Sequence, residues 1–273
     1  MAGRTPNPCV LCNTHIKWDA LMQRADALGC EFIATGHYAR IRTDEETGRH
    51  ILMRGLDTNK DQSYALWGVS QENFSRTIFP LGDLTKPEIR QMASDFGLDH
   101  VAAKPDSYEI CFVPDNNYRR FLKDRVPDMD ERAGPGPYVS SSGEKIGTHE
   151  GYPFYTIGQR HGLGLALGYP AYVTSIDADT NTVTIGTKEE LMRFKLTASM
   201  FNPIKYSDLK TEQIAAAKIR YNDEGAPCIA SQDDEGKLHV AFPEPRKAIT
   251  PGQAVVVYEG DDVLGGAWID SVG

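Results

Sequence analysis

Residues 14–41 read THIKWDALMQRADALGCEFIATGHYARI, and this stretch decides the fold of the first part of the chain. Segment 14–29 has the apolar spacing of an amphipathic helix and ends at a glycine. Segment 31–41 then reads as a strand that runs into a glycine turn. The predicted apolar side of the helix consists of Ile16, Ala20, Leu21, Ala25 and Leu28. A helix followed by a strand in this way is typical of an α/β layer.

A second helix is predicted at residues 85–97, TKPEIRQMASDFG. Thr85 and Glu88 have the spacing of a capping box, and Pro87 lies in the first turn, where its missing N–H costs nothing. Apolar residues then recur at helical spacing up to a glycine stop at position 97. The members of this stripe are Ile89, Met92, Ala93 and Phe96.

The pattern changes after about residue 113. Residues 116–126, NNYRRFLKDRV, predict a short helix. Residues 134–153 are rich in Gly, Pro and Ser, so we expect mostly turns and loop there. Residues 170–187, PAYVTSIDADTNTVTIGT, have two β-branched runs around an Asp/Asn-rich turn, which predicts a hairpin. This part therefore reads as a small mixed domain.

From about residue 196 onward only strand signals remain. The runs AAAKIRY, PCIASQ, KLHVAF, AVVVYEG and GGAWIDS are separated by short polar turns. Regularly spaced short strands are typical of a small barrel or sandwich. The predicted order is thus part of an α/β domain, a small mixed domain and a β domain.

The composition is that of a globular protein. The chain has 273 residues, of which 40% are hydrophobic and 25% charged, and this length suggests two or three domains. The sequence has neither an apolar run long enough to cross a bilayer nor an apolar leader, so we expect a soluble, cytoplasmic protein without a membrane partner. A net charge of −9 argues against general binding to phosphate backbones, although a local basic groove remains compatible with it.

Two cysteines three residues apart, Cys9 and Cys12, lie in TPNPCVLCN at residues 5–13. In a reducing compartment a Cys-x-x-Cys pair is more often metal-binding or redox-active than a structural bridge. Asn13-Thr14 resembles a helix N-cap directly after Cys12, and a helix N-terminus favours the thiolate. The alternative is two buried thiols that act as small apolar residues.

The other cysteines carry weaker signals. Cys111, between Ile and Phe, is by itself typical of a core position, and Cys30 and Cys228 read as packing residues. A zinc site is weakly supported, because Cys-x-x-Cys plus one distant Cys lacks a second ligand pair. Three thiolates could hold an iron–sulfur cluster with one iron open, although such clusters usually take four.

Three polar clusters have two readings each. Residues 60–62, Lys-Asp-Gln, read as a functional cluster or as a solvated turn. Residues 159–161, Gln-Arg-His, lie between glycines and suit phosphate or base contacts, or form a charged loop. Lys218 and Arg220 are expected on one face of a strand beside Tyr221, as a nucleotide contact or an ordinary exposed strand.

Taken in order, these stretches resemble one family, the tRNA-specific 2-thiouridylases. The resemblance is nearly end to end and is carried by TPNPCVLCN, ATGHYAR, KDQSYALWGVS, FPLGDLTKPEIR, KPDSYEICFVPD, IGTHEGYPFYTIGQRHGLG, AKIRY, and ITPGQAVVVYEGD followed by GGAWI. It implies three domains: the C-terminal part of an ATP-pyrophosphatase domain of the adenine-nucleotide alpha-hydrolase type (1–112), a central tRNA-binding domain (113–195) and a C-terminal β-barrel (196–273).

The resemblance also implies a sulfur-transfer reaction. Such enzymes use ATP with Mg²⁺ to adenylylate the C2 oxygen of wobble uridine 34 in tRNA and then replace that oxygen with sulfur. AMP is a good leaving group and a persulfide is a strong nucleophile, so the chemistry is reasonable. The implied partners are tRNA and an upstream sulfur donor, either a cysteine desulfurase or a sulfur-relay protein.

Matching the motifs residue by residue gives each position an implied role. Cys111 matches the persulfide-carrying cysteine, and Cys12 matches the nucleophile that can close a disulfide with it as sulfur is released. Gly36 matches a nucleotide contact. The remaining matches are Asn7, Pro8 and Cys9 for the target base, and Lys60, Asp61, Gln62, Arg220 and Tyr221 for tRNA.

The sequence departs from the family pattern in two ways. The SGGVDSS phosphate-gripping loop does not occur in it, so we expect the chain to be catalytically incomplete as given. Many members carry Asp at the position of Cys9, and a thiol is a poor replacement for a carboxylate in acid–base work. Two alternatives follow: a tRNA-binding module without catalysis, or a [4Fe-4S]-dependent thiolase with Cys9, Cys12 and Cys111 as cluster ligands.

Overall fold

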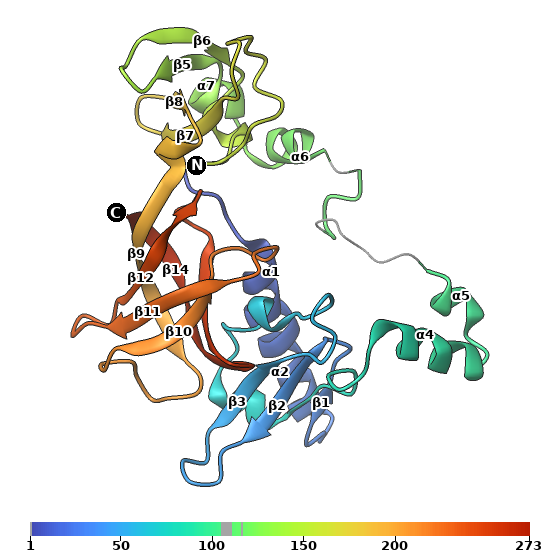
Figure 1. Cartoon of the computed structure of the whole chain (residues 1–273). Helices are drawn as coiled ribbons and strands as arrows, with labels where there is room; N and C mark the ends of the chain where they lie inside the picture. The colour runs from blue at the N-terminus through green and yellow to red at the C-terminus, as the bar shows by residue number, and fades with distance from the viewer. Residues whose placement is uncertain (1, 105–110, 116) are drawn as a thin grey trace.

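The computed structural model describes residues 2–104, 111–115 and 117–273, and it has three parts (Figure 1). A first part of helices and short strands lies against a C-terminal barrel. A small mixed domain is connected to the barrel by the long strand β9 (Met192–Pro203). The predicted order of an α/β domain, a mixed domain and a β-barrel is therefore confirmed.

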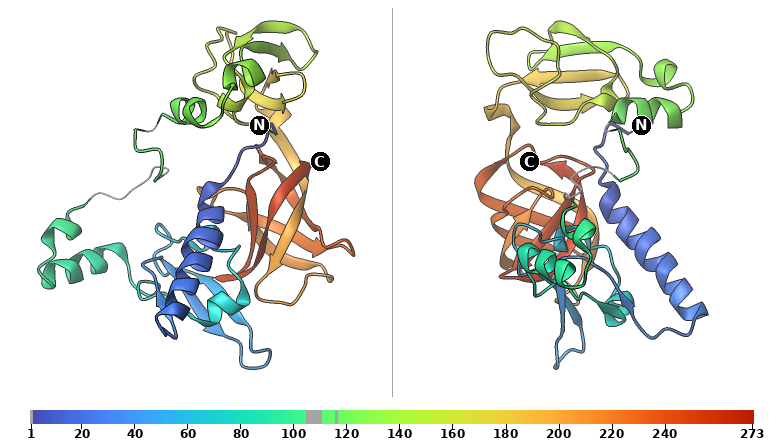
Figure 2. Two further views of the ribbon diagram at one scale, coloured as in Figure 1. Left: turned by 180° about the vertical axis from the view of Figure 1, so that it is seen from behind. Right: turned by 90° about the vertical axis from the view of Figure 1, so that its right-hand side faces the viewer.

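The first part is built on one continuous helix, visible along its length in Figure 2. It consists of α1 (Pro8–Leu11), the π-helical segment η1 (Cys12–Asp19) and α2 (Ala20–Ala27). The predicted apolar face is wrong except at Ala25, because Ile16 and Leu28 are 67% and 64% exposed. The buried face consists of Ala25 together with Val10, Trp18 and Met22. The helix begins earlier than the apolar periodicity indicated, and its π-helical turns shift which side chains face the core.

Behind this helix lies a parallel strand pair, β1 (Ile33–Ala34) and β4 (Thr77–Ile78), with Ile33 opposite Thr77. The hydroxyl of Thr77 accepts a hydrogen bond of 2.9 Å from the indole of Trp18, which fastens the helix to this sheet. Two short helices, η2 (Ser63–Ala65) and α3 (Gln71–Ser75), complete this part of the fold. The parallel pair confirms the α/β prediction.

Two further helices, α4 (Lys86–Asp95) and α5 (Asp99–Ala102), project from the body of the molecule in Figures 1 and 2. The predicted capping box of Thr85 and Glu88 is present. Of its apolar stripe, Met92 is 41% exposed and Phe96 at the C-cap is 73% exposed, whereas Ile89 and Ala93 are partly buried. The local signals therefore predicted the helix correctly, but part of its apolar face remains exposed.

The mixed domain contains helices α6 (Tyr118–Arg125) and α7 (Met129–Ala133), the short η3 (Tyr152–Phe154) and a four-stranded sheet. The sheet order is β6 (Lys145–His149), β5 (Gly136–Ser140), β8 (Thr182–Gly186) and β7 (Tyr172–Asp177). The predicted hairpin at 170–187 is confirmed as β7 and β8.

The expectation of mostly loop at 134–153 is wrong, because β5 and β6 form there. Pro137 lies ahead of the ladder that β5 forms with β8, which begins at Tyr138, so its missing N–H does not interrupt that pairing. Gly136 lies so close to the turn between β7 and β8 that an added Cβ would be 2.2 Å from the carbonyl oxygen of Asn181. Here Gly and Pro mark a close backbone approach within a strand and not a loop.

The barrel follows a short helix, η4 (Glu189–Leu191), and contains six strands that close on themselves. Their order is β13, β10, β11, β12, β9 and β14, and β13 pairs back with β14. Beside β9, the strands are β10 (Gln213–Lys218), β11 (Ala226–Gln232), β12 (Leu238–Lys247), β13 (Ala254–Glu259) and β14 (Asp262–Val272). Of the two architectures expected from the strand pattern, the barrel is the one that forms.

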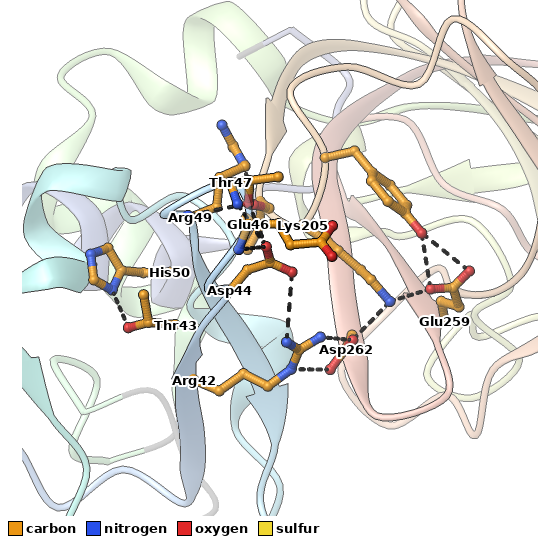
Figure 3. A network of polar contacts seen from close by, with 12 residues as sticks. Arg42, Thr43, Asp44, Glu46, Thr47, Arg49, His50, Lys205, Glu259 and Asp262 are labelled. Carbon is orange, nitrogen blue, oxygen red and sulfur yellow. Dashed lines mark hydrogen bonds and ion pairs between the residues drawn. The ribbon is translucent and has the colours of Figure 1, made fainter.

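The first part and the barrel share both a sheet and a core. The hairpin of β2 (Ala39–Thr43) and β3 (His50–Arg54) extends the barrel sheet, with Met53 opposite Asp262 of β14. Figure 3 shows the polar contacts at this junction, where the Asp262 carboxylate forms ion pairs with the guanidinium of Arg42 at 2.7 Å and the ammonium of Lys205 at 2.8 Å. Lys205 also pairs with Glu259. Because these contacts join two domains, they fix the barrel relative to the cysteine-bearing helix.

Candidate functional site

Cys9 and Cys12 lie on one turn at the start of the long helix. The backbone N–H of Cys12 donates to the carbonyl oxygens of Cys9 and Pro8, so the two cysteines are helical neighbours. The predicted N-cap at Asn13-Thr14 is wrong, since the helix begins at Pro8. Asn13 lies inside the helix, and its side-chain amide donates a hydrogen bond of 2.9 Å to the carbonyl oxygen of Ala65. The first turn of the helix therefore contains Cys9, directly after Pro8.

Cys111, distant in sequence, is close enough to Cys9 to affect its ionisation. Burial of the Cys9 thiol raises its pKa, and negative charge on Cys111 and Cys12 raises the pKa further. The ammonium of Lys17 opposes these effects and lowers the pKa. Cys12 and Cys111 therefore both lie within electrostatic range of Cys9, and we call these three cysteines the thiol cluster.

All five cysteines are free, and their exposure differs. Cys9 and Cys111 reach solvent, and Cys12 is partly exposed. The core interpretation of Cys111 is therefore wrong. Cys228 is buried, as expected, whereas Cys30 is exposed and the packing interpretation of it is wrong.

Next to the thiol cluster, Lys17 is held by His37. The Lys17 ammonium lies 3.3 Å from Nε2 of His37, and Nδ1 of His37 lies 3.0 Å from the hydroxyl of Thr35. Burial, with a smaller contribution from Lys17, lowers the pKa of His37 to about 4. The imidazole is therefore neutral at pH 7, so Nε2 accepts from Lys17 and Nδ1–H donates to Thr35.

Gly36 lies in the same loop, immediately after β1. It is exposed, and a Cβ built on it would make only an ordinary contact of 3.6 Å with Leu81. In α/β sheets, ligands bind outside the carboxyl ends of the parallel strands, which is where this loop lies. The position is compatible with a nucleotide base or ribose.

The segment 60–62 is a structural part of the site and not a solvated turn. The side chain of Asp61 is buried and accepts from the backbone N–H of Gly55 at 3.1 Å, and from both the N–H and the hydroxyl of Ser63 at 3.0 Å. The side-chain oxygen of Gln62 accepts a hydrogen bond of 3.0 Å from the N–H of Tyr38, and this contact fixes the Gly36 loop. Lys60 is half-buried.

Tyr221 connects the barrel to this segment. Its hydroxyl donates to the carbonyl oxygen of Asp61 at 3.4 Å, and its ring meets Tyr64 edge to face at 6.1 Å between centroids. Burial raises the pKa of Tyr221, and the charges of Asp61 and Cys9 add to that rise. The tyrosine is nevertheless 46% exposed, so one part of its ring remains accessible next to the thiol cluster.

Lys218 and Arg220 do not share a face as expected. Lys218 ends β10 and is buried, with its ammonium 6.0 Å from the Tyr64 ring, while Arg220 is exposed in the following turn. Burial lowers the pKa of Lys218, and the charges of Asp61 and Asp223 oppose this. Strand alternation failed here because β10 ends before Arg220.

Asn7 and Pro8 lead into the thiol cluster along the barrel. Asn7 is 9% exposed and hydrogen-bonds with the Tyr64 hydroxyl, which itself donates 2.8 Å to the carbonyl oxygen of Ala254. Pro8 is half-buried at the first helical position. Tyr221 therefore connects the predicted segments 7–12 and 60–62. It hydrogen-bonds to Asp61 and lies within electrostatic range of Cys9.

Two features of the site were missed from the sequence. Lys17 and His37 adjoin motifs that were recognised, but only the folded chain brings them together.

The predicted Gln159–His161 cluster does not belong to this site. Arg160 and His161 line an open hollow of 630 Å³ formed by residues 160–171.

The described residues contain neither a group of three or more His, Cys, Asp or Glu side chains placed to hold a metal ion nor a helix long and apolar enough to span a membrane. The thiol cluster therefore does not fit an iron–sulfur cluster in the arrangement described. Within it, Lys17 is the cation that lowers the pKa of Cys9.

Comparison with known families matches nearly the whole chain. Residues 1–115 match the tRNA methyl transferase HUP domain, residues 119–187 the tRNA methyl transferase PRC-barrel domain, and residues 193–269 the aminomethyltransferase beta-barrel domain. The chain is 64% identical over 273 residues to tRNA-specific 2-thiouridylase MnmA of Salinibacter ruber, covering 100% of this chain and 71% of that relative. Proteins of the same name from Amoebophilus asiaticus and Cytophaga hutchinsonii are 58% and 54% identical over 270 residues, covering 98% of this chain and 71% and 73% of those relatives.

Proposed function

The chain belongs to the tRNA-specific 2-thiouridylase family, and on that premise we propose that its thiol cluster carries sulfur to C2 of wobble uridine 34 in tRNA. Cys111 holds the sulfur as a persulfide, and Cys12 is the nucleophile that releases it. The observation that carries this proposal is the electrostatic proximity of Cys111 to the Cys9–Cys12 turn, because the two segments are about a hundred residues apart.

The proposed transfer proceeds in two displacements. ATP first adenylylates the C2 oxygen, and the terminal sulfur of the Cys111 persulfide then attacks C2, so that the oxygen leaves with AMP. The Cys12 thiolate next attacks Sγ of Cys111. The bond to the transferred sulfur breaks, its electron pair remains on that sulfur as 2-thiouridine forms, and a Cys12–Cys111 disulfide is left.

Substrate binding is divided among the three parts of the chain. In the proposal, residues 1–112 hold ATP with Mg²⁺ near Gly36, residues 113–195 hold tRNA, and residues 196–273 contribute Arg220 and Tyr221. The accessible Tyr221 ring offers a stacking surface for an unstacked base, which is how proteins read single-stranded RNA loops. Asn7 and Pro8 border the same space.

The buried Asp61 modifies the expectation for segment 60–62. Its carboxylate is satisfied within the protein, so we propose that it supports the tRNA-contacting residues on either side and does not touch RNA itself. Exposed Cys111 and Phe112 form the side from which a cysteine desulfurase or a sulfur-relay protein delivers sulfur.

A thiolation assay tests the proposal. Wobble-uridine tRNA, ATP and a persulfide donor are incubated with the chain alone, or with the part of the Salinibacter relative that this chain does not match supplied as a second polypeptide. The 2-thiouridine formed is measured by mass spectrometry. With the second polypeptide present, we expect 2-thiouridine to form. Cys12→Ser or Cys111→Ser should abolish its formation, and Cys30→Ser, which changes a matched exposed thiol, should leave it unchanged. Tight tRNA binding without thiouridine under either condition would indicate the binding-module alternative instead.

A further inference from the structure

The thiol cluster contains one thiol more than the proposed transfer uses. Cys12 and Cys111 account for the disulfide that transfer leaves, while Cys9 lies one turn from Cys12 and within electrostatic reach of Cys111. A disulfide between Cys12 and Cys111 blocks both reacting thiols. The next turnover requires that it be opened.

Cys9 has the position needed to open it. The N–H of Cys12 bonds to the carbonyl oxygen of Cys9 within the helix, so the two side chains are i, i+3 neighbours on one face. Cys-x-x-Cys at a helix start is the spacing at which exchanging disulfides form in redox proteins. Cys9 also reaches solvent, so its sulfur is free to move toward Cys12.

We infer that Cys9 is a resolving thiol that transfers the disulfide from the Cys12–Cys111 pair to the Cys9–Cys12 pair. The inference rests on the proposed function, which generates the first disulfide. The Cys9 thiolate attacks Sγ of Cys12, the bond from Sγ of Cys12 to Sγ of Cys111 breaks, and its electron pair leaves on Cys111. One disulfide and one thiolate are present before and after the step, so it needs neither an oxidant nor a reductant.

The charges around Cys9 make the exchange depend on the state of the other two thiols. In the reduced cluster, burial raises the pKa of Cys9, and the charges of Cys111 and Cys12 raise it further. A Cys12–Cys111 disulfide carries no charge, so both of these effects disappear when it forms. The lowering effect of Lys17 remains, and Lys17 is held by neutral His37. Tyr221 is a further titratable group within electrostatic range of Cys9. Cys9 therefore becomes more acidic when a thiolate is needed.

The product state suits a repeated reaction. Cys111 is exposed, and once released it can accept the next sulfur. The Cys9–Cys12 disulfide closes only one helical turn at the protein surface, where an external dithiol can reduce it by the same exchange chemistry. Cys9 thus separates reloading of Cys111 from reduction of the spent pair.

Peptide mapping of the oxidised chain tests this inference without ATP or tRNA. Trypsin leaves Cys9 and Cys12 together in peptide 5–17 and Cys111 in peptide 91–119. The chain is treated with one equivalent of diamide, quenched at intervals with an alkylating agent, digested without reduction and analysed by mass spectrometry. The proteins compared are wild type, Cys9→Ser, Cys9→Ala and the matched control Cys30→Ser.

In wild type and Cys30→Ser we expect a cross-link between the two peptides that appears first and decays. It gives way to an internal disulfide in peptide 5–17 and alkylated Cys111. In Cys9→Ser and Cys9→Ala the cross-link is the end product. The amount of alkylated Cys111 is then lower than in wild type by about tenfold or more, a ratio that corresponds to a difference of ~30 mV between the reduction potentials of the two disulfides.

Two results would overturn the inference: a wild-type cross-link that persists, or a Cys9–Cys12 disulfide that forms without a preceding cross-link. Failure of both Cys9 variants to form any cross-link is a different outcome. It would contradict the Cys12–Cys111 pairing of the proposed function, and the resolving role with it.

Discussion

The hydroxyl of Tyr221 donates a hydrogen bond to the backbone oxygen of Asp61 at 3.4 Å, although the two residues belong to the barrel and to the first part of the chain. On the other side of that backbone, the Asp61 carboxylate accepts three hydrogen bonds from Gly55 and Ser63. Two segments that resemble tRNA contacts in the sequence are thus one physical unit. The exposed Tyr221 is held by the backbone of Asp61, whose side chain is buried, and it lies within electrostatic range of Cys9.

Tyr221→Ala should weaken tRNA binding more than Tyr221→Phe. The alanine variant loses a stacking ring, which costs about 1–3 kcal/mol per stacked base. The phenylalanine variant keeps the ring and loses only the hydrogen bond to Asp61, worth about 1 kcal/mol. Fluorescence anisotropy with a labelled anticodon stem-loop measures both dissociation constants. Equal affinity of Tyr221→Ala and wild type would show that the ring does not stack on the RNA.

Asp61→Asn should destabilise the folded protein. An amide cannot accept all the hydrogen bonds that the carboxylate now receives, and buried Lys218 loses a counter-charge, so we expect a loss of about 1–3 kcal/mol. Urea unfolding followed by fluorescence measures the change. Asp83→Asn is the matched control, because the Asp83 side chain is 83% exposed and should change stability by less than about 0.5 kcal/mol. Similar losses in the two variants would refute the supporting role of Asp61.

His37 should make the protein less stable in acid. Its pKa is about 4 in the folded chain against an ordinary value of 6.5, so the unfolded chain takes up a proton first as the pH falls. This contribution to stability is complete above about pH 6.5 and decreases toward pH 4 by up to about 1.4 kcal/mol per pH unit. Urea unfolding at pH 7.5 and pH 5 should show a smaller difference for His37→Gln than for wild type. Exposed His161→Gln is the control, and an unchanged difference in His37→Gln would contradict a neutral buried His37.

Lys205→Met should loosen the junction between the barrel and the β2–β3 hairpin. Lys205 serves both Asp262 and Glu259, and the Asp262 side chain is only 10% exposed, so removing the ammonium leaves a largely buried carboxylate with Arg42 alone. We expect a loss of about 1–3 kcal/mol in urea unfolding. Lys237→Met removes a surface pair with Glu235 and should cost less than about 1 kcal/mol. A Lys205→Met loss no larger than this control would mean that the pair contributes little to the junction.

Local signals predicted much of the fold. The capping box at Thr85, the hairpin at 170–187 and the strands after residue 196 depend on residues near one another in sequence, and all formed. The buried face of the first helix did not follow from its periodicity. Residues 12–19 are π-helical, and the core that receives Trp18 includes Val256 of the barrel, far along the chain. Burial there is decided by tertiary packing.

The candidate site was predictable to a similar extent. The spacing of Cys9 and Cys12 drew attention to the right turn, but Cys111 alone read as a core residue, and its proximity to Cys9 depends on the folded chain. The pairing of Lys17 with His37 left no sequence pattern of its own. Asp61 read as polar and solvated, because sequence does not reveal that three donors surround its carboxylate.

Transfer of labelled sulfur in a single turnover tests the central claim most directly. The protein is loaded with ³⁴S as a persulfide, freed of excess donor, and mixed with ATP and wobble-uridine tRNA together with the part of the Salinibacter relative that this chain does not match. Peptide 91–119 and the tRNA nucleosides are then analysed by mass spectrometry. The account predicts that each labelled 2-thiouridine formed matches one ³⁴S lost from Cys111, and that Cys111→Ser yields none. Thiouridine formed at the wild-type rate by Cys111→Ser, or label that stays on Cys111 while thiouridine appears, would contradict it.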